Sequence, residues 1–120
     1  MIAAKNDSYM TSTVKNKINY TKQYIDAHYN DTSLSVFGLA SMLEMSDVYY
    51  RKLFKMEIGV SPSKYIISVR LKKAKQLIED YPFLNLEECA KQSGFSSLHY
   101  FSRVFTSEFG INPSKYKKNN

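Results

Sequence analysis

The chain of 120 residues has little of what several classes of protein depend on. It has one cysteine, which excludes a disulfide framework within the chain and a cluster of cysteine ligands for a metal. No apolar run approaches the roughly 18 residues that a membrane-spanning helix needs. There is no tryptophan, and no stretch alternates apolar and polar residues as a half-buried strand does. These absences favour a helical protein with neither a structural metal nor a transmembrane segment.

Acidic residues are outnumbered by basic ones. Seventeen Lys and Arg against eleven Asp and Glu give a formal net charge of +6 and a pI near 9.3. Such a surface attracts phosphate, although many ordinary soluble proteins are as basic. The single cysteine, Cys89, falls where an internal repeat places Leu39, and we interpret it as a small core residue rather than a reactive thiol. We expect a cytoplasmic location.

The last third of the chain repeats the middle third. Residues 34–46 match residues 84–96 at an offset of 50, and Ser46 matches Ser96. After Ser46 the offset becomes 51, and the repeat closes with Ser-Pro-Ser-Lys-Tyr at 61–65 against Asn-Pro-Ser-Lys-Tyr at 112–116. The second copy therefore has one extra residue near a turn. A unit this short is too small to be a catalytic domain. Two basic copies suggest a protein that grips a repeating partner, such as duplex DNA, at two points.

Apolar residues recur at steps of three and four, which predicts helices. The expected ranges are about 13–29, 36–43, 46–58, 62–80, 85–93, 97–109 and 113–116. Ser35 and Ser46 are typical N-caps, and either Ser96 or Ser97 caps the sixth helix. Asn85 followed by Glu88 has the pattern of a capping box.

A short helix, a tight turn and a longer helix make the helix-turn-helix plan, whose second helix enters the major groove. The sequence has this plan twice. We predict an all-α fold of about seven helices, with two helix-turn-helix subdomains joined by a long linker helix. The expected boundaries are a tail or linker over 1–12, a first subdomain over 13–60, the linker helix over 61–81 and a second subdomain over 82–120. A linker of about 20 residues is roughly 30 Å long, close to the ~34 Å between successive major grooves.

The second helix of each unit has an apolar face and a polar face. In the first unit the apolar face is predicted to hold Tyr49, Tyr50, Leu53 and Phe54, and the outward face Asp47, Val48, Arg51, Lys52 and Lys55. In the second unit the corresponding sets are Tyr100, Phe101, Val104 and Phe105 facing inward, and Leu98, His99, Ser102, Arg103 and Thr106 facing outward. One such helix would be interpreted as an ordinary solvated face. The same pattern after a turn in both copies favours recognition helices.

The chain resembles the AraC/XylS family of bacterial transcription regulators over nearly all of residues 14–116. The match is carried by Leu39-Ala40 with 49–55, by Val69-Arg70-Leu71 with Ala74, and by Gly94-Phe95-Ser96, 100–105 and 109–113 with Tyr116. The resemblance implies a monomeric unit of two helix-turn-helix motifs joined by a long helix. Such a unit binds double-stranded DNA, usually at the C-terminus of a larger regulator, and often activates transcription by contacting RNA polymerase.

Carried over position by position, the resemblance places base-reading residues at Val48, Arg51, Lys52, Leu98, His99, Ser102 and Arg103, the set that the outward faces also indicate. Arg51 and Arg103 are the best candidates for bidentate contacts with guanine. Val48 or Leu98 suits a thymine methyl group. We expect contacts with the DNA backbone from Ser46, Lys55, Lys64, Ser97, Thr106 and Lys115. Each lysine is equally well an ordinary solvated charge.

The first unit departs from the family pattern at two places. Glu44 stands in a turn where glycine is common, which predicts backbone strain. Phe37-Gly38 replace Glu87-Glu88 of the second copy, which removes a capping box and predicts a helix start weaker by ~1 kcal/mol. Phe37 would then be exposed and contact a sensor domain or polymerase, unless it tucks back onto the core.

Two other functions were weighed. A DNA-repair enzyme would need a metal-held cysteine cluster, and Cys89 stands alone with only His28 and His99 as histidines. We therefore expect no enzymatic activity, no cofactor and no metal. A helical protein-interaction bundle stays open, since salt-dependent DNA binding is what would separate it from a regulator. The loose residues at the start suggest the DNA-binding piece of a larger regulator with an N-terminal sensor or receiver domain, rather than a whole small regulator.

Overall fold

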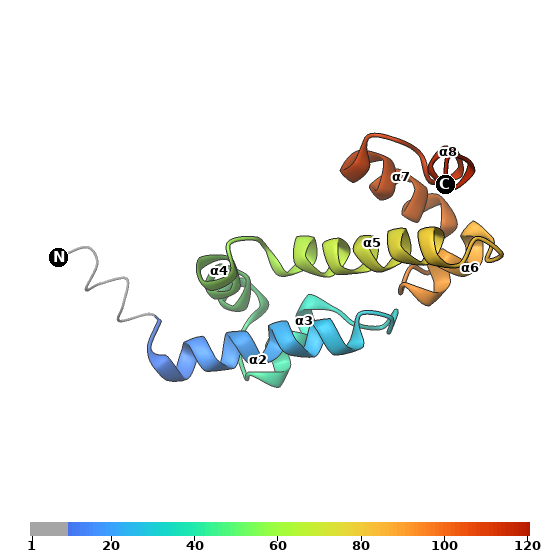
Figure 1. Cartoon of the computed structure of the whole chain (residues 1–120). Helices are drawn as coiled ribbons and strands as arrows, with labels where there is room; N and C mark the ends of the chain where they lie inside the picture. The colour runs from blue at the N-terminus through green and yellow to red at the C-terminus, as the bar shows by residue number, and fades with distance from the viewer. Residues whose placement is uncertain (1–9) are drawn as a thin grey trace. The chain divides into compact units, whose positions relative to one another are not determined.

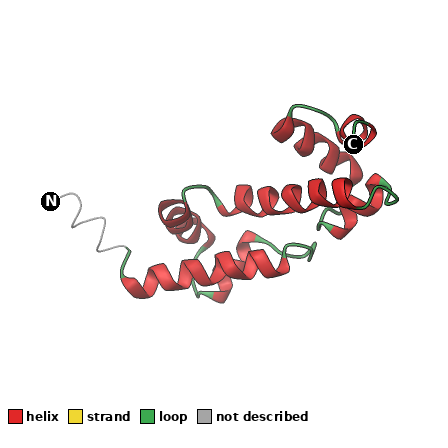
Figure 2. Cartoon of the chain, in the orientation of Figure 1, coloured by secondary structure: helices red, strands yellow, loops and turns green. Residues whose placement is uncertain are grey.

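A computed structural model describes residues 10–120 of the chain. Within them lie seven helices: α2 (Ser12–His28), α3 (Val36–Met42), α4 (Asp47–Ile58), α5 (Pro62–Asp80), α6 (Leu86–Gln92), α7 (Leu98–Phe109) and α8 (Pro113–Lys118) (Figure 1). Loops connect them, and this part of the chain contains no strand (Figure 2). The all-α prediction is confirmed. The tail predicted over residues 1–12 lies outside the described residues, except for Met10, Thr11 and Ser12, with which α2 begins.

The chain forms two compact units. The first comprises the described residues up to His28 together with Ser33–Ile66, and the second comprises Tyr29–Thr32 and Ile67–Asn120. The first unit therefore holds α2, α3, α4 and the first turn of α5. The second holds the rest of α5, α6, α7 and α8, together with the four residues that follow α2.

The core of the first unit forms where α4 packs against α2 and α3. Buried side chains come from all three helices: Ile18 and Ile25 of α2, Leu39 and Ala40 of α3, and Tyr50, Leu53 and Phe54 of α4. The two buried hydroxyls in this core form a chain of hydrogen bonds that ends on a backbone carbonyl. Tyr50 Oη donates to Thr21 Oγ1 at 2.8 Å, and Thr21 Oγ1 donates to the Ile18 carbonyl oxygen at 2.8 Å. Burial raises the pKa of Tyr50, so its proton stays in place.

The second unit repeats this packing around α7. Its buried cluster consists of Leu71, Ala74, Ile78, Cys89, Ala90, Phe95, Phe101 and Phe105. Phe101 and Phe105 pack edge to face with ring centroids 5.5 Å apart. Cys89 is fully buried and burial raises the pKa of its thiol, so the structure agrees with its interpretation as a core residue.

Helix ends fall close to the predicted positions. The side chains of Ser35, Ser46, Asn85 and Ser97 each accept a hydrogen bond from a backbone N–H in the first turn. Ser97 rather than Ser96 caps α7, so the residue inserted in the second copy is Ser96. The repeat shift therefore falls just before the cap, and Ser46 corresponds to Ser97.

Each of the two shorter helices has one cap bond, but only α6 also has acids in its first turn, Glu87 and Glu88. Gly38 N donates to Ser35 Oγ at 3.0 Å, and Glu88 N donates to Asn85 Oδ1 at 2.8 Å. The Glu88 carboxylate accepts from Gln92 Nε2 at 3.0 Å rather than completing the predicted box. The capping box predicted for α6 is therefore absent, while the weaker start of α3 stays a prediction. Phe37 is 72% exposed, so of the two alternatives left open by the sequence it does not tuck back onto the core.

Tyr49 and Tyr100 were predicted to face inward, and this was wrong. They are 39% and 36% exposed. Residues three and four apart share a helix face, so the buried stripe of α4 runs through Tyr50, Leu53 and Phe54. Tyr49 lies about 100° around the helix from Tyr50, at the margin of that stripe. Tyr100 holds the same place on α7.

Candidate nucleic-acid interface

The outer face of α4 brings four of the predicted contact residues together. Val48, Arg51, Lys52 and Lys55 are all exposed and are spaced by three, four and seven residues from Val48, so they lie on one side of the helix. Val48 is 71% exposed, and an apolar side chain gains no free energy by remaining in water. This face combines three cations with one apolar side chain, which is a suitable composition for reading base edges next to phosphates.

The outer face of α7 gathers the predicted residues of the second unit. His99, Ser102 and Arg103 line a shallow, open depression together with Thr106 and Ser107. Leu98 is exposed in the first turn of the same helix. The Arg103 guanidinium lies over the Tyr100 ring, 5.3 Å from its centroid, so the exposed Tyr100 supports a cation. Sequence reasoning missed this contact because it placed Tyr100 in the core.

The hydroxyl groups of the predicted backbone-contacting residues differ in what they can still donate. Ser46 Oγ and Ser97 Oγ accept from Tyr49 N at 3.2 Å and from Tyr100 N at 3.1 Å, which leaves the hydroxyl proton of each serine for a phosphate. Thr106 Oγ1 instead donates to the Ser102 carbonyl oxygen at 2.7 Å. A phosphate contact from Thr106 would have to replace that bond, so Thr106 is the weakest member of the predicted set.

Lys64 and Lys115 occupy the same place in the two units. Each is exposed in the first turn of the helix that follows a recognition helix, α5 for Lys64 and α8 for Lys115. Their backbone N–H groups donate to cap side chains, to Ser61 Oγ at 3.2 Å and to Asn112 Oδ1 at 2.8 Å. Each lysine thus adds a cation to a helix N-terminus, a combination that suits phosphate binding.

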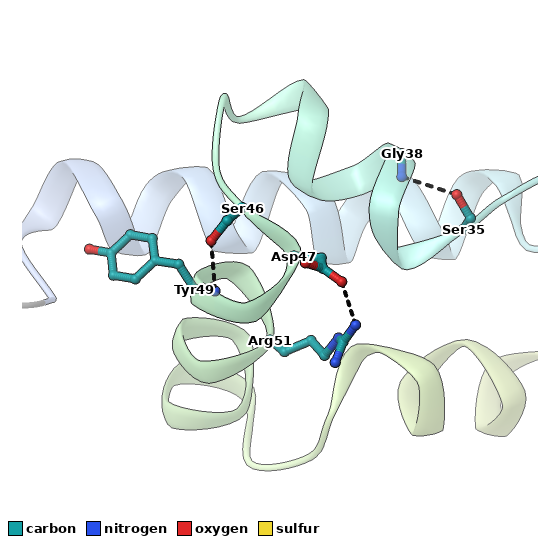
Figure 3. Close-up of polar contacts among 6 residues, drawn as sticks. All are labelled: Ser35, Gly38, Ser46, Asp47, Tyr49 and Arg51. Atoms are coloured by element: carbon teal, nitrogen blue, oxygen red, sulfur yellow. Dashed lines mark hydrogen bonds and ion pairs between the residues drawn. The ribbon is translucent and has the colours of Figure 1, made fainter.

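Arg51 does not stand alone on the outer face of α4. Its Nη2 donates to Asp47 Oδ2 at 2.5 Å, one turn earlier on the same helix (Figure 3). Both residues were predicted on the outward face, and their spacing of four residues is the local signal that indicates the pair. At the offset of 51, Arg51 corresponds to Ser102 and Lys52 to Arg103, so the two candidate arginines hold different positions on their helices.

A second feature that sequence reasoning missed is a three-residue cluster that occurs in both units. In the first unit Tyr65 Oη donates to Asp26 Oδ1 at 2.6 Å, and Lys22 Nζ lies 3.7 Å from Asp26 Oδ2. Lys22 also lies over the Tyr65 ring. We call this group the Lys-Asp-Tyr cluster of the first unit.

The second unit has the corresponding Lys-Glu-Tyr cluster. Tyr116 Oη donates to Glu79 Oε2, Lys75 Nζ lies 4.0 Å from Glu79 Oε2, and Lys75 lies over the Tyr116 ring. Each cluster ties the first turn after a recognition helix to the helix that precedes the helix-turn-helix motif. The repeated Tyr was visible in the sequence. The acid and the lysine recur at an offset of 53, outside the matched repeat. The repeat therefore did not indicate that they correspond.

Arg70 fixes the segment that follows α2 to the second unit. Its Nε donates to the Tyr29 carbonyl oxygen at 2.7 Å and its Nη2 donates to the Asp31 carbonyl oxygen at 2.8 Å. Burial lowers the pKa of this guanidinium, which nevertheless stays charged. Gly94 lies against the same segment, where an added Cβ would be 2.2 Å from the Tyr29 carbonyl oxygen. Arg70 therefore has a structural task and is separate from the residues predicted to contact DNA.

Comparisons with known proteins agree with this architecture. A family model described as "Helix-turn-helix domain" matches residues 39–119. The chain is 36% identical over 89% of its length to the Msm operon regulatory protein of Streptococcus mutans, and it spans 38% of that protein. Other relatives are named as transcription activators. From Met10 onward, no helix combines the length and the apolar character needed to span a membrane.

Two solved structures have the same fold. The C-terminal domain of the two-component response regulator yesN from Fusobacterium nucleatum superimposes with a TM-score of 0.80 and 28% identity, over 85% of this chain and 98% of that one. A probable AraC family transcriptional regulator from Rhodopseudomonas palustris superimposes with a TM-score of 0.74 and 27% identity, over 87% of this chain and 96% of that one. Given two helix-turn-helix units with exposed second helices, the chain belongs to the AraC-type family of helix-turn-helix DNA-binding domains of bacterial transcription regulators.

Proposed function

We propose that the chain binds a specific sequence of duplex DNA, with α4 and α7 as recognition helices that enter successive major grooves. The observation that carries this proposal is the repetition of one helix arrangement in two units. Both helices are capped by serine, both bury one aromatic stripe, and both expose a polar face with at least one cation.

The proposed contacts divide into two kinds. Base edges are read by Val48, Arg51, Lys52, Leu98, His99, Ser102 and Arg103. Phosphates are contacted by Ser46, Lys55, Lys64, Ser97, Thr106 and Lys115, with Thr106 contributing least because its proton is used within α7. Cations and cap hydroxyls around a base-reading face position the protein, and the face itself supplies the sequence preference.

We also propose that the chain is the DNA-binding part of a larger bacterial regulator. It spans between 26% and 38% of the length of three curated relatives, and a solved neighbour is the C-terminal domain of a response regulator. An N-terminal sensor or receiver domain, a cytoplasmic location and contact with RNA polymerase as an activator follow from this view.

Binding to duplex DNA is expected to weaken steeply with salt. Each phosphate neutralised by Lys or Arg releases a counterion, so the logarithm of the binding constant should fall linearly with the logarithm of the salt concentration, with a slope of about −0.9 per contact. Fluorescence anisotropy at several salt concentrations, on a duplex selected from a random pool, measures this slope. A slope near zero would leave the helical protein-interaction bundle as the better interpretation.

The two kinds of contact predict different effects of mutation. Arg51→Ala and Arg103→Ala should each weaken binding to the selected duplex by roughly 1–3 kcal/mol and relax the preference at one position. The two positions should be about 10 base pairs apart. Lys55→Ala should instead weaken binding to all sequences about equally and make the salt slope smaller by about one. Selection from a random pool, repeated with each variant, separates these outcomes.

If both arginine variants keep the wild-type sequence preference and affinity, the assignment of Arg51 and Arg103 as base readers is wrong. Salt-dependent binding alone would then support DNA as the partner without the proposed division of contacts.

A further inference from the structure

The ion pair on the outer face of α4 joins a proposed base-reading residue to an acid. Asp47 and Arg51 are one helical turn apart, with the acid nearer the N-terminus, and their side chains point toward one another (Figure 3). Both side chains are partly exposed, Asp47 over 39% of its area and Arg51 over 53%. The negative charge of Asp47 interacts favourably with the positive N-terminal end of the helix dipole. It also interacts favourably with Arg51, which lies four residues later on the same side of the helix.

The pair leaves Arg51 able to bind a base. The guanidinium has five N–H donors, and the bond to Asp47 uses one of them, on Nη2. The second proton of Nη2 and the neighbouring donors remain for the O6 and N7 atoms of guanine. Asp47 therefore holds the side chain from one edge without blocking the fork that a bidentate contact requires.

Holding the guanidinium has a consequence for recognition. A free arginine side chain loses most of its rotational freedom when it binds a base, and this loss weakens the contact. An arginine already oriented by a carboxylate loses less, so the contact with the correct base becomes stronger relative to other contacts. The carboxylate itself repels phosphates, which lowers affinity for every sequence alike.

We propose that Asp47 is a positioning residue for specificity: it orients Arg51 toward a base edge and at the same time weakens binding to unrelated DNA. The inference rests on the proposed function of α4 as a recognition helix. Asp47 is negatively charged, so its charge alone would oppose binding to DNA. The proposal gives it a role in discriminating between DNA sequences.

The second unit handles its arginine differently. The positions that correspond to Asp47 and Arg51 are Leu98 and Ser102, and Arg103 lies over the Tyr100 ring. An aromatic ring supports a cation without adding a negative charge near the phosphates. The carboxylate effect is therefore expected in the first unit and not in the second.

The test compares Asp47→Asn with wild type on three duplexes of equal length: the sequence selected by wild type, the same sequence changed at the base pair that Arg51→Ala relaxes, and an unrelated sequence. Asp47→Asn should bind the unrelated duplex more tightly and discriminate the changed base pair about three- to ten-fold less well. Its preference at the base pair assigned to Arg103 should not change. A loss of folding would instead weaken binding to all three duplexes.

Two variants serve as controls. Glu87→Gln removes an acid from the first turn of α6, also exposed, and should raise affinity for all three duplexes without changing discrimination. In an Arg51→Ala background, Asp47→Asn should no longer alter discrimination. If Arg51→Ala changes the preference and Asp47→Asn does not, the role of Asp47 is refuted and the proposed function stands. If Arg51→Ala itself changes nothing, the base-reading assignment of α4 fails first.

Discussion

At the scale of single residues, the two helix-turn-helix motifs place different residue types at the left-handed position of the turn. Glu44 has a φ of 57°, and Gly94, at the same place in the second unit, has a φ of 99°. Both lie in the left-handed region, which is costly for a residue with a side chain. Gly94 is also required sterically, because of the Tyr29 carbonyl oxygen beside it. The turn thus tolerates a side chain in the first unit at a cost in conformational energy, and excludes one in the second.

Replacing Glu44 by glycine should therefore stabilise the protein. The relief of left-handed strain, about 1–2 kcal/mol, exceeds the added chain entropy of glycine in the unfolded state, about 0.4–1 kcal/mol. We expect Glu44→Gly to raise the free energy of unfolding by about 0.5–1 kcal/mol, measured by urea denaturation.

Two variants bracket this result. Glu44→Ala removes the carboxylate but keeps the Cβ atom, and should give no gain. Gly94→Ala places the Cβ against the Tyr29 carbonyl oxygen and should lower the free energy of unfolding by about 2 kcal/mol or more. A gain from Glu44→Ala equal to that from Glu44→Gly would attribute the effect to charge rather than to backbone strain.

At the scale of helices, periodicity and capping residues are local signals, and they were sufficient to place the helices. Ser46 and Gly59 bound α4 as predicted, because a cap bond and a left-handed end depend only on neighbouring residues. The side of a helix that becomes buried depends on what packs against it. The burial of Tyr50 beside the exposure of Tyr49 follows from the positions of α2 and α3, which periodicity alone does not give.

The same distinction separates what was predictable in the interface from what was not. The outward positions of Val48 and Arg51 follow from helix geometry. The pair between Asp47 and Arg51 was within reach, since its spacing is a local signal. The bond between Tyr65 and Asp26 joins residues 39 positions apart and depends on how α5 begins against α2, so no pattern in one stretch of sequence could indicate it.

At the scale of the whole molecule, the duplicated chain conserves its supports more closely than its outward faces. The Lys-Asp-Tyr and Lys-Glu-Tyr clusters use the same three kinds of side chain, and the aromatic contacts behind them, Phe54 with Tyr65 and Phe105 with Tyr116, both have ring centroids 5.8 Å apart. The outward residues of α4 and α7 differ at most positions. Two units with common supports and different outward faces are suited to the proposed reading of two different half-sites.

The two clusters also predict how the stability of the whole chain depends on pH. Burial and the bond to Asp26 raise the pKa of Tyr65 above its ordinary value near 10, and the bond to Glu79 raises that of Tyr116. The folded state thus keeps these protons while the unfolded chain loses them above about pH 10. The stability that the bonds supply is complete below pH 10 and is lost as the pH rises further toward the raised values.

We therefore expect the melting temperature to fall as the pH is raised above about 10. Variants that lack one tyrosine hydroxyl test whether the two clusters cause this fall. At pH 8, Tyr65→Phe and Tyr116→Phe should each lower the free energy of unfolding by about 0.5–1 kcal/mol, because each removes a partly exposed bond to a carboxylate. As the pH rises past 10 the curves of both variants should approach that of wild type, since the bond contributes less there. The curve of Tyr20→Phe, a variant at an exposed tyrosine, should stay parallel to that of wild type at every pH. Thermal unfolding between pH 7 and pH 11 gives the four curves, and constant gaps for Tyr65→Phe and Tyr116→Phe would mean that the clusters do not control the alkaline loss of stability.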